Sequence, residues 1–192
     1  MKQARLLTET ERKRLAAVID SRRHATRNHT AIALSFYAGL RACEIAALRV
    51  CDVFDDAGAV RDTIYLSATQ TKGSTGNTVF VNKRLAAALK RYATMYSKHV
   101  KRPSAPIMYS GKGGGFSPQT VVNLFQHLYK VAGIAGASSH SGRRQFITEL
   151  ADKGVSARLV QAAARHRSLA VTMRYIDVNE NKLRAAIELV NY

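Results

Sequence analysis

Six side chains along this sequence have types that together could transfer a phosphodiester. Such a transfer needs a nucleophile in line with the breaking bond, a proton acceptor, compensation for charge on the phosphate oxygens, and an acid for the leaving oxygen. In chain order the candidates are Arg41, Lys72, His140, Arg143, His166 and Tyr175. Because the set offers a group for each of these tasks, it predicts a site for phosphoryl transfer.

The tyrosine and the two histidines can supply the nucleophile and its proton acceptor. Tyr175 can attack phosphorus and keep the bond energy in a phosphodiester to the protein, ready for religation. His140 is placed to accept the tyrosine proton, and His166 to hydrogen-bond the phosphate.

The cationic side chains can stabilise charge on the phosphate. Arg41 and Arg143 each offer a planar fork of N–H donors, and Lys72, on an expected hairpin, can protonate the leaving 5′ oxygen as general acid. These three cations supply the charge that other phosphoryl-transfer enzymes take from Mg²⁺. The sequence also contains no carboxylate cluster at metal-binding spacing. We therefore expect metal-independent chemistry and no cofactor.

Each candidate also has an ordinary structural interpretation. Arg41 and Glu44 form an i, i+3 pair that on most helices would be a solvated ion pair. Lys72 can be a solubilising charge, and Tyr175 a core tyrosine whose hydroxyl reaches water. His140 and Arg143 lie one helical turn apart, a spacing that often arises by chance. Considered one at a time, the residues leave these alternatives open.

The charge of the chain favours a nucleic acid as partner. Lys and Arg number 30 against 13 Asp and Glu, a net charge of +17. Such an excess predicts binding to a polyanion, with nucleic acid ahead of an acidic membrane surface. The alternative is a merely basic protein, because basicity alone specifies no chemistry.

Other features narrow the class of protein. The 192 residues fit one domain. No apolar run approaches the roughly 20 residues of a membrane span, and no signal peptide is recognisable. Cys43 and Cys51 lack zinc-ligand spacing and suggest no disulfide framework, so a cytoplasmic location is expected. The glycine-rich run 111–115 lacks the spacing of a phosphate-binding loop, so no nucleotide site is predicted.

Helix and strand signals predict the α+β class, mainly α, with one small antiparallel hairpin. Polar, basic residues 21–28 are expected to connect the first two helices, and residues 72–77 to form the hairpin tip. Capping signals and apolar periodicity predict helices at 8–20, 29–38, 41–48, 83–95, 118–128, 140–152, 156–164, 169–175 and 179–190, and strands at 63–66 and 78–81.

The order and spacing of these residues resemble the tyrosine recombinases, the phage integrase family. The first family box is matched at residues 38–48 (AGLRACEIAAL), and the hairpin lysine by Lys72. The second box is matched by the H-x-x-R stretch at 140–143, and the third by His166 with Tyr175 nine residues later, which is the family's spacing. The resemblance extends from about Thr8 to Val190.

The resemblance implies a catalytic domain, spanning 1–192, that cleaves and rejoins DNA through a 3′-phosphotyrosyl intermediate. The outcome would be integration, excision, inversion or resolution. Double-stranded DNA would be the partner, and copies would associate on it as a dimer or tetramer in a synaptic complex. Most members carry an N-terminal helical domain that clamps the other face of DNA. This chain resembles the short members without that domain, such as fimbrial phase-variation switches.

The resemblance also bears on three further features. Glu44 would brace the site, with a plain surface salt bridge as the alternative. Residues 179–192 resemble the tail helix that docks into a neighbouring protomer; packing on its own core is the alternative. Arg165 stands where the family usually has glycine, so the backbone there departs from the pattern.

Two other functions share this set of residues. One is a type IB topoisomerase-like nicking-closing enzyme, which rejoins DNA without exchanging partners; relaxation of a supercoiled plasmid lacking a specific site would favour it. The other is a catalytically silent DNA-binding relative, which failure to form a covalent adduct would favour. The complete residue set argues against the silent relative.

Overall fold

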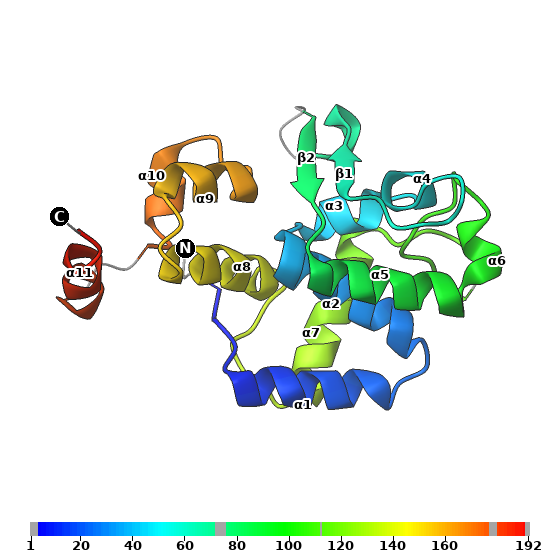
Figure 1. Cartoon of the computed structure of the whole chain (residues 1–192). Coiled ribbons are helices and arrows are strands. Elements are labelled where there is room, and N and C mark those ends of the chain that lie inside the picture. Colours follow the sequence, from blue (N-terminus) through cyan, green and yellow to red (C-terminus); the bar gives the residue numbers. More distant parts are fainter. Residues whose placement is uncertain (1–3, 72–75, 112, 177–179, 191–192) are drawn as a thin grey trace. The chain divides into compact units, whose positions relative to one another are not determined.

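The computed structural model describes residues 4–71, 76–111, 113–176 and 180–190. The chain forms two compact units, Met1–Phe146 (unit 1) and Ile147–Tyr192 (unit 2). It is mainly helical with a small antiparallel sheet, which confirms the predicted fold class (Figure 1). The helices of unit 1 are α1 (Glu9–Asp20), α2 (Ala25–Ala38), α3 (Ala42–Ala47), α4 (Val50–Val53), the 3₁₀ helix η1 (Ala68–Gln70), α5 (Lys83–Met95), α6 (Ser97–Val100) and α7 (Pro118–Val131). Helix α8 (Ser141–Asp152) continues into unit 2, which also holds α9 (Ala157–Ala164), α10 (Leu169–Met173) and α11 (Glu180–Ile187).

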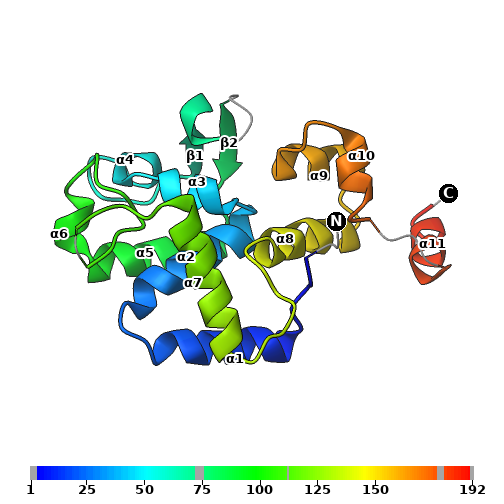
Figure 2. The same cartoon turned by 180° about the vertical axis from the view of Figure 1, so that it is seen from behind.

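The core of unit 1 is built around α2. This helix packs against α1 and α5, while α7 contacts both α1 and α3 (Figure 2). Leu34, Leu89 and Phe125, from α2, α5 and α7, are fully buried. Burying large apolar side chains is the dominant favourable term in folding, so this core fixes the helices that carry the first candidate residues.

Strand β1 (Thr63–Leu66) pairs antiparallel with β2 (Asn77–Phe80). Ile64, Leu66 and Val79 are buried, whereas Tyr65 on the opposite face of β1 is 63% exposed. This alternation is what a strand with one covered face requires. Strand β1 has its predicted bounds, whereas β2 both begins and ends one residue earlier than predicted. Lys72, between the strands, lies outside the described residues.

Helix starts follow the capping signals. Thr8 Oγ1 accepts the backbone N–H of Glu11, and Glu11 Oε2 accepts that of Thr8, so both halves of a capping box are present where the helix at 8–20 was predicted to begin. The side chains of Asn82 and Ser117 cap α5 and α7 by accepting the backbone N–H of Leu85 and of Thr120. Each cap satisfies a backbone N–H that has no partner within its helix.

The second helix begins earlier than predicted. Residues 25–28 were expected in a connection because they are polar, yet they form the first turn of α2, and Thr26, Arg27 and Asn28 are buried. Arg27 Nη1 donates to the Tyr109 carbonyl at 2.8 Å, and its guanidinium lies over the ring of Phe116. Removal from water lowers the pKa of Arg27. Partners distant in sequence thus satisfy polar groups that, in isolation, favour a loop.

Candidate functional site

Arg41 is held by a buried carboxylate. It is the N-cap of α3, where its backbone N–H donates to Glu44 Oε2 at 2.8 Å and its Nη1 donates to Glu44 Oε1 at 2.7 Å. The Glu44 side chain is 1% exposed and that of Arg41 is 26% exposed. One buried carboxylate therefore fixes both the backbone and the guanidinium of Arg41, so this pair is not a solvated surface ion pair.

Arg143 is anchored on the turn that leads to Arg41. It lies in the first turn of α8, is 5% exposed, and donates from Nη1 to the Gly39 carbonyl at 2.5 Å. Gly39 ends α2 in the left-handed conformation, at φ 60°. Because Gly39 is only two residues before Arg41, one turn positions both arginines.

Two glycines allow α8 to approach α2 closely enough for this contact. A Cβ atom at Gly142 would lie 2.4 Å from Ser35 Oγ and 2.6 Å from Phe36 Cδ2. A Cβ at Gly39 would lie 2.6 Å from Phe146 Cδ1. All three distances are far below van der Waals contact, so a side chain at either position would push the helices apart and move Arg143. Both glycines lie within the sequence motifs, and the position of Gly39 after an apolar helix favours a C-cap there, which is confirmed. The close packing at both positions involves residues distant in sequence, so no local pattern predicts it.

His140 lies immediately before α8. Its carbonyl accepts the Arg144 N–H at 2.9 Å, and its own N–H donates to Ser138 Oγ at 3.3 Å. His140 is exposed, so its imidazole is accessible on the surface of unit 1. The predicted helix at 140–152 is confirmed apart from this first residue.

In unit 2, the backbone of His166 is fixed to the end of α9. Its N–H donates to the Gln161 carbonyl at 3.1 Å, and its carbonyl accepts Gln161 Nε2 at 3.2 Å. Arg165, just before it, is the C-cap of α9 with φ 56° and ψ 47°. This position therefore has the left-handed conformation that glycine adopts at no steric cost, although arginine occupies it.

Replacing Arg165 with glycine is expected to stabilise the protein. Left-handed backbone costs an L-residue roughly 1–2 kcal/mol, and the greater freedom of glycine in the unfolded chain offsets part of this. We expect the free energy of unfolding to rise by about 0.5–1 kcal/mol in a urea titration. Arg167→Gly is the matched control, because Arg167 is not among the described residues that have a positive φ. This change should not stabilise the protein. Equal effects of the two changes would contradict the backbone explanation.

The His166 ring lies next to Tyr175. His166 Nδ1 is 2.9 Å from Thr172 Oγ1, and the His166 and Tyr175 rings are stacked, with centroids 5.6 Å apart and planes at 25°. The Tyr175 N–H donates to the Thr172 carbonyl at 2.9 Å. Helix α10 ends at Met173, so the prediction that it extends to Tyr175 is wrong; the tyrosine lies in the turn that follows. Sequence reading missed Thr172, whose signal was its place one helical turn before Tyr175.

The candidates therefore form two sets. Unit 1 holds the arginines with Glu44, and also His140; unit 2 holds His166 and Tyr175. The first set can offer N–H donors to an anion, and the second can offer a hydroxyl nucleophile beside an imidazole.

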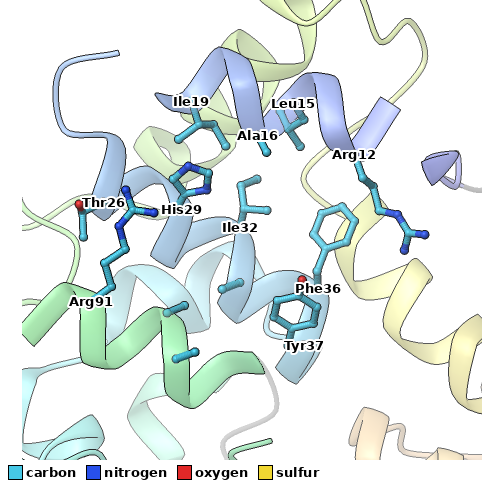
Figure 3. A pocket seen from close by; sticks show the side chains of 13 residues that line it. Arg12, Leu15, Ala16, Ile19, Thr26, His29, Ile32, Phe36, Tyr37 and Arg91 are labelled. Carbon is cyan, nitrogen blue, oxygen red and sulfur yellow. The ribbon is translucent and has the colours of Figure 1, made fainter. Parts of the chain in front are cut away.

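A separate cavity of about 360 Å³ lies between α1, α2 and α5 (Figure 3). Leu15 and Ile19 of α1 line it together with Ile32 and Phe36 of α2, and Arg91 of α5 lies at its edge. None of the candidate residues lines this cavity.

The described residues provide neither a membrane-spanning helix nor a metal-binding cluster. No helix among them is both long and apolar enough to span a bilayer. Within the same ranges, no group of three or more His, Cys, Asp or Glu side chains could hold a metal ion.

Known proteins resemble the chain over almost its whole length. The model of the phage integrase family matches residues 5–182. Tyrosine recombinase XerA of Pyrococcus horikoshii is 27% identical over 186 residues, which are 95% of this chain and 60% of that protein. The type 1 fimbriae regulatory protein FimB of Escherichia coli K12 is 29% identical over 94% of this chain and 88% of its own length. The crystal structure of XerA recombinase superposes with a TM-score of 0.77 at 25% identity, over 100% of this chain and 68% of that one.

Proposed function

The chain belongs to the phage integrase family, and from this membership we propose that it is the catalytic part of a site-specific DNA recombinase. Units 1 and 2 would act as one catalytic domain that cleaves and rejoins strands through a 3′-phosphotyrosyl intermediate. The observation that carries the proposal is the stacked pair of His166 and Tyr175, 5.6 Å between ring centroids, which sets a nucleophile beside a proton-bearing ring.

The arginines would bind the phosphate that Tyr175 attacks. Arg143 and Arg41 are held by the Gly39 carbonyl and by Glu44, so their geometry is set before DNA arrives. Donors that need no reorganisation stabilise charge developing in a transition state most effectively. His166 would add a hydrogen bond to the phosphate, and His140 would accept the tyrosine proton. In this scheme Glu44 positions Arg41.

Protonation of the leaving group would complete the reaction. We assign this step to Lys72, which would give a proton to the 5′ oxygen as the bond to phosphorus breaks. Two arginines and a lysine would compensate the negative charge of the phosphate, and the reaction would then need no metal ion.

Covalent capture tests this function. The protein is incubated in EDTA with fragmented DNA of its source organism, denatured with detergent, and the covalently bound DNA is sequenced. We expect adducts at a few discrete sites, each with a free 5′ hydroxyl that polynucleotide kinase labels without prior phosphatase treatment. Adducts spread without site preference, with relaxation of any supercoiled plasmid, would instead support a nicking-closing enzyme. No adduct in EDTA or in Mg²⁺ would support a silent DNA-binding relative.

Double-stranded DNA would also bring copies of the chain together. The net charge of +17 favours a polyanionic partner. Leu183 and Ile187, on α11, are 57% and 64% exposed, one helical turn apart, and could pack against a second copy in a dimer or tetramer. Cooperative binding to paired half-sites, compared with single half-sites in a gel-shift titration, is the measurement that checks this assembly.

A further inference from the structure

Thr172 connects the two residues of the stacked pair. It is fully buried, its Oγ1 is 2.9 Å from His166 Nδ1, and its carbonyl accepts the Tyr175 N–H at 2.9 Å. One residue thus contacts the histidine through its side chain and the tyrosine through its backbone.

The direction of the Thr172–His166 hydrogen bond follows from burial. Among the residues that the structure describes, His166 Nδ1 is the hydrogen-bond partner found for the Thr172 hydroxyl. If Nδ1 carried a proton and donated to Oγ1, the proton of the hydroxyl would be buried without an acceptor. Buried polar hydrogens are nearly always satisfied in folded proteins. The arrangement that satisfies both groups has the hydroxyl donating to a bare Nδ1.

A bare Nδ1 places the ring proton of neutral His166 on Nε2. The two nitrogens of an imidazole lie on different sides of the ring, and the hydrogen bond made by one sets the protonation of the other. Nε2 therefore becomes an N–H donor without any change of charge. A donor, and not an acceptor, is what an anionic phosphate oxygen requires.

We propose that Thr172 is a positioning residue that keeps the proton of His166 on Nε2 and holds the turn that carries Tyr175. The expected effect on DNA cleavage rests on the proposed function. The tautomer of His166, by contrast, can be measured in the protein without DNA. Thr172 would act as buried groups in other enzymes do when they orient a catalytic histidine through the ring nitrogen that faces away from the substrate.

Two nearly isosteric substitutions separate the hydroxyl from the shape of the side chain. Thr172→Val keeps the branched form and removes the hydroxyl, whereas Thr172→Ser keeps the hydroxyl and removes the methyl group. We expect Thr172→Val to slow adduct formation by about 10- to 100-fold, a typical loss for a partner that orients a functional histidine. Thr172→Ser should restore most of this loss, even if it lowers the unfolding midpoint more. Cleavage that follows the order of stability, with the serine variant slower than the valine variant, would overturn the proposal.

Nitrogen NMR of the ring gives a readout that does not depend on activity. With ¹⁵N-histidine-labelled protein at about pH 8, where an ordinary histidine is neutral, the His166 signals are assigned by their loss in His166→Gln. We expect protonated Nε2 and bare Nδ1 in the wild type and in Thr172→Ser, and a mixture of tautomers in Thr172→Val. Protonated Nδ1 in the wild type, or an unchanged tautomer in Thr172→Val, would overturn the proposal. If the wild-type protein forms no adduct, the proposed function fails, but the NMR comparison still decides the role of Thr172.

Discussion

Replacing Tyr175 with phenylalanine is expected to abolish the covalent protein–DNA adduct and to leave DNA binding nearly unchanged. The phenyl ring keeps the stacking on His166 and the backbone hydrogen bond to Thr172, so only the nucleophilic oxygen is lost. Removing a nucleophile reduces turnover by at least about 10⁴-fold in well-studied enzymes. The measurement is adduct formation on a nicked duplex that traps the intermediate, in EDTA, beside a gel-shift titration with the same DNA.

Tyr129→Phe is the matched control for this change. Its hydroxyl is buried in α7 and has no hydrogen-bond partner among the described residues, so its removal should leave both folding and cleavage intact. Peptide mapping of the wild-type adduct provides a second check. DNA attached to any tyrosine other than Tyr175 would show that the proposed nucleophile is wrong.

The second large effect is expected at the arginines. Arg143→Ala should slow adduct formation by about 10²–10³-fold, which is the usual loss of transition-state stabilisation when one donor to a developing oxyanion is removed. Arg41→Ala should have a similar effect, because Glu44 holds its guanidinium in the same turn region. Single-turnover cleavage at saturating protein measures this loss separately from DNA binding.

Arg144→Ala controls for the loss of a charged side chain from α8. Arg144 is the next residue along the helix, and its Nη1 also donates to a backbone carbonyl, that of Ala4. We expect this variant to weaken DNA binding slightly, through its charge, and to cleave bound DNA at the wild-type rate. If Arg143→Ala and Arg144→Ala slow cleavage equally, the effect reflects net charge or the stability of α8, and Arg143 has no special role at the phosphate.

The sequence by itself determined the local elements and the chemistry of the candidates. The caps at Thr8, Asn82 and Ser117 act between residues three apart, so their patterns predicted where α1, α5 and α7 begin. Strand β1 was predicted with its exact bounds because alternation of buried and exposed residues is also a local property. The nine-residue spacing between His166 and Tyr175 is also a local property, because one short helix and its flanking turns span it.

The tertiary structure alone decided which groups hold these residues in place. Arg143 donates to the carbonyl of Gly39, 104 residues away, and the close approach that permits it depends on glycine at position 142. Burial made the polar residues around Arg27 part of α2, and it also fixed the direction in which Thr172 bonds to His166. The physical reason is the same in each case. The preference of a polar group for a loop, a helix or a partner depends on whether water or protein satisfies it, and only the packed chain determines which one surrounds it.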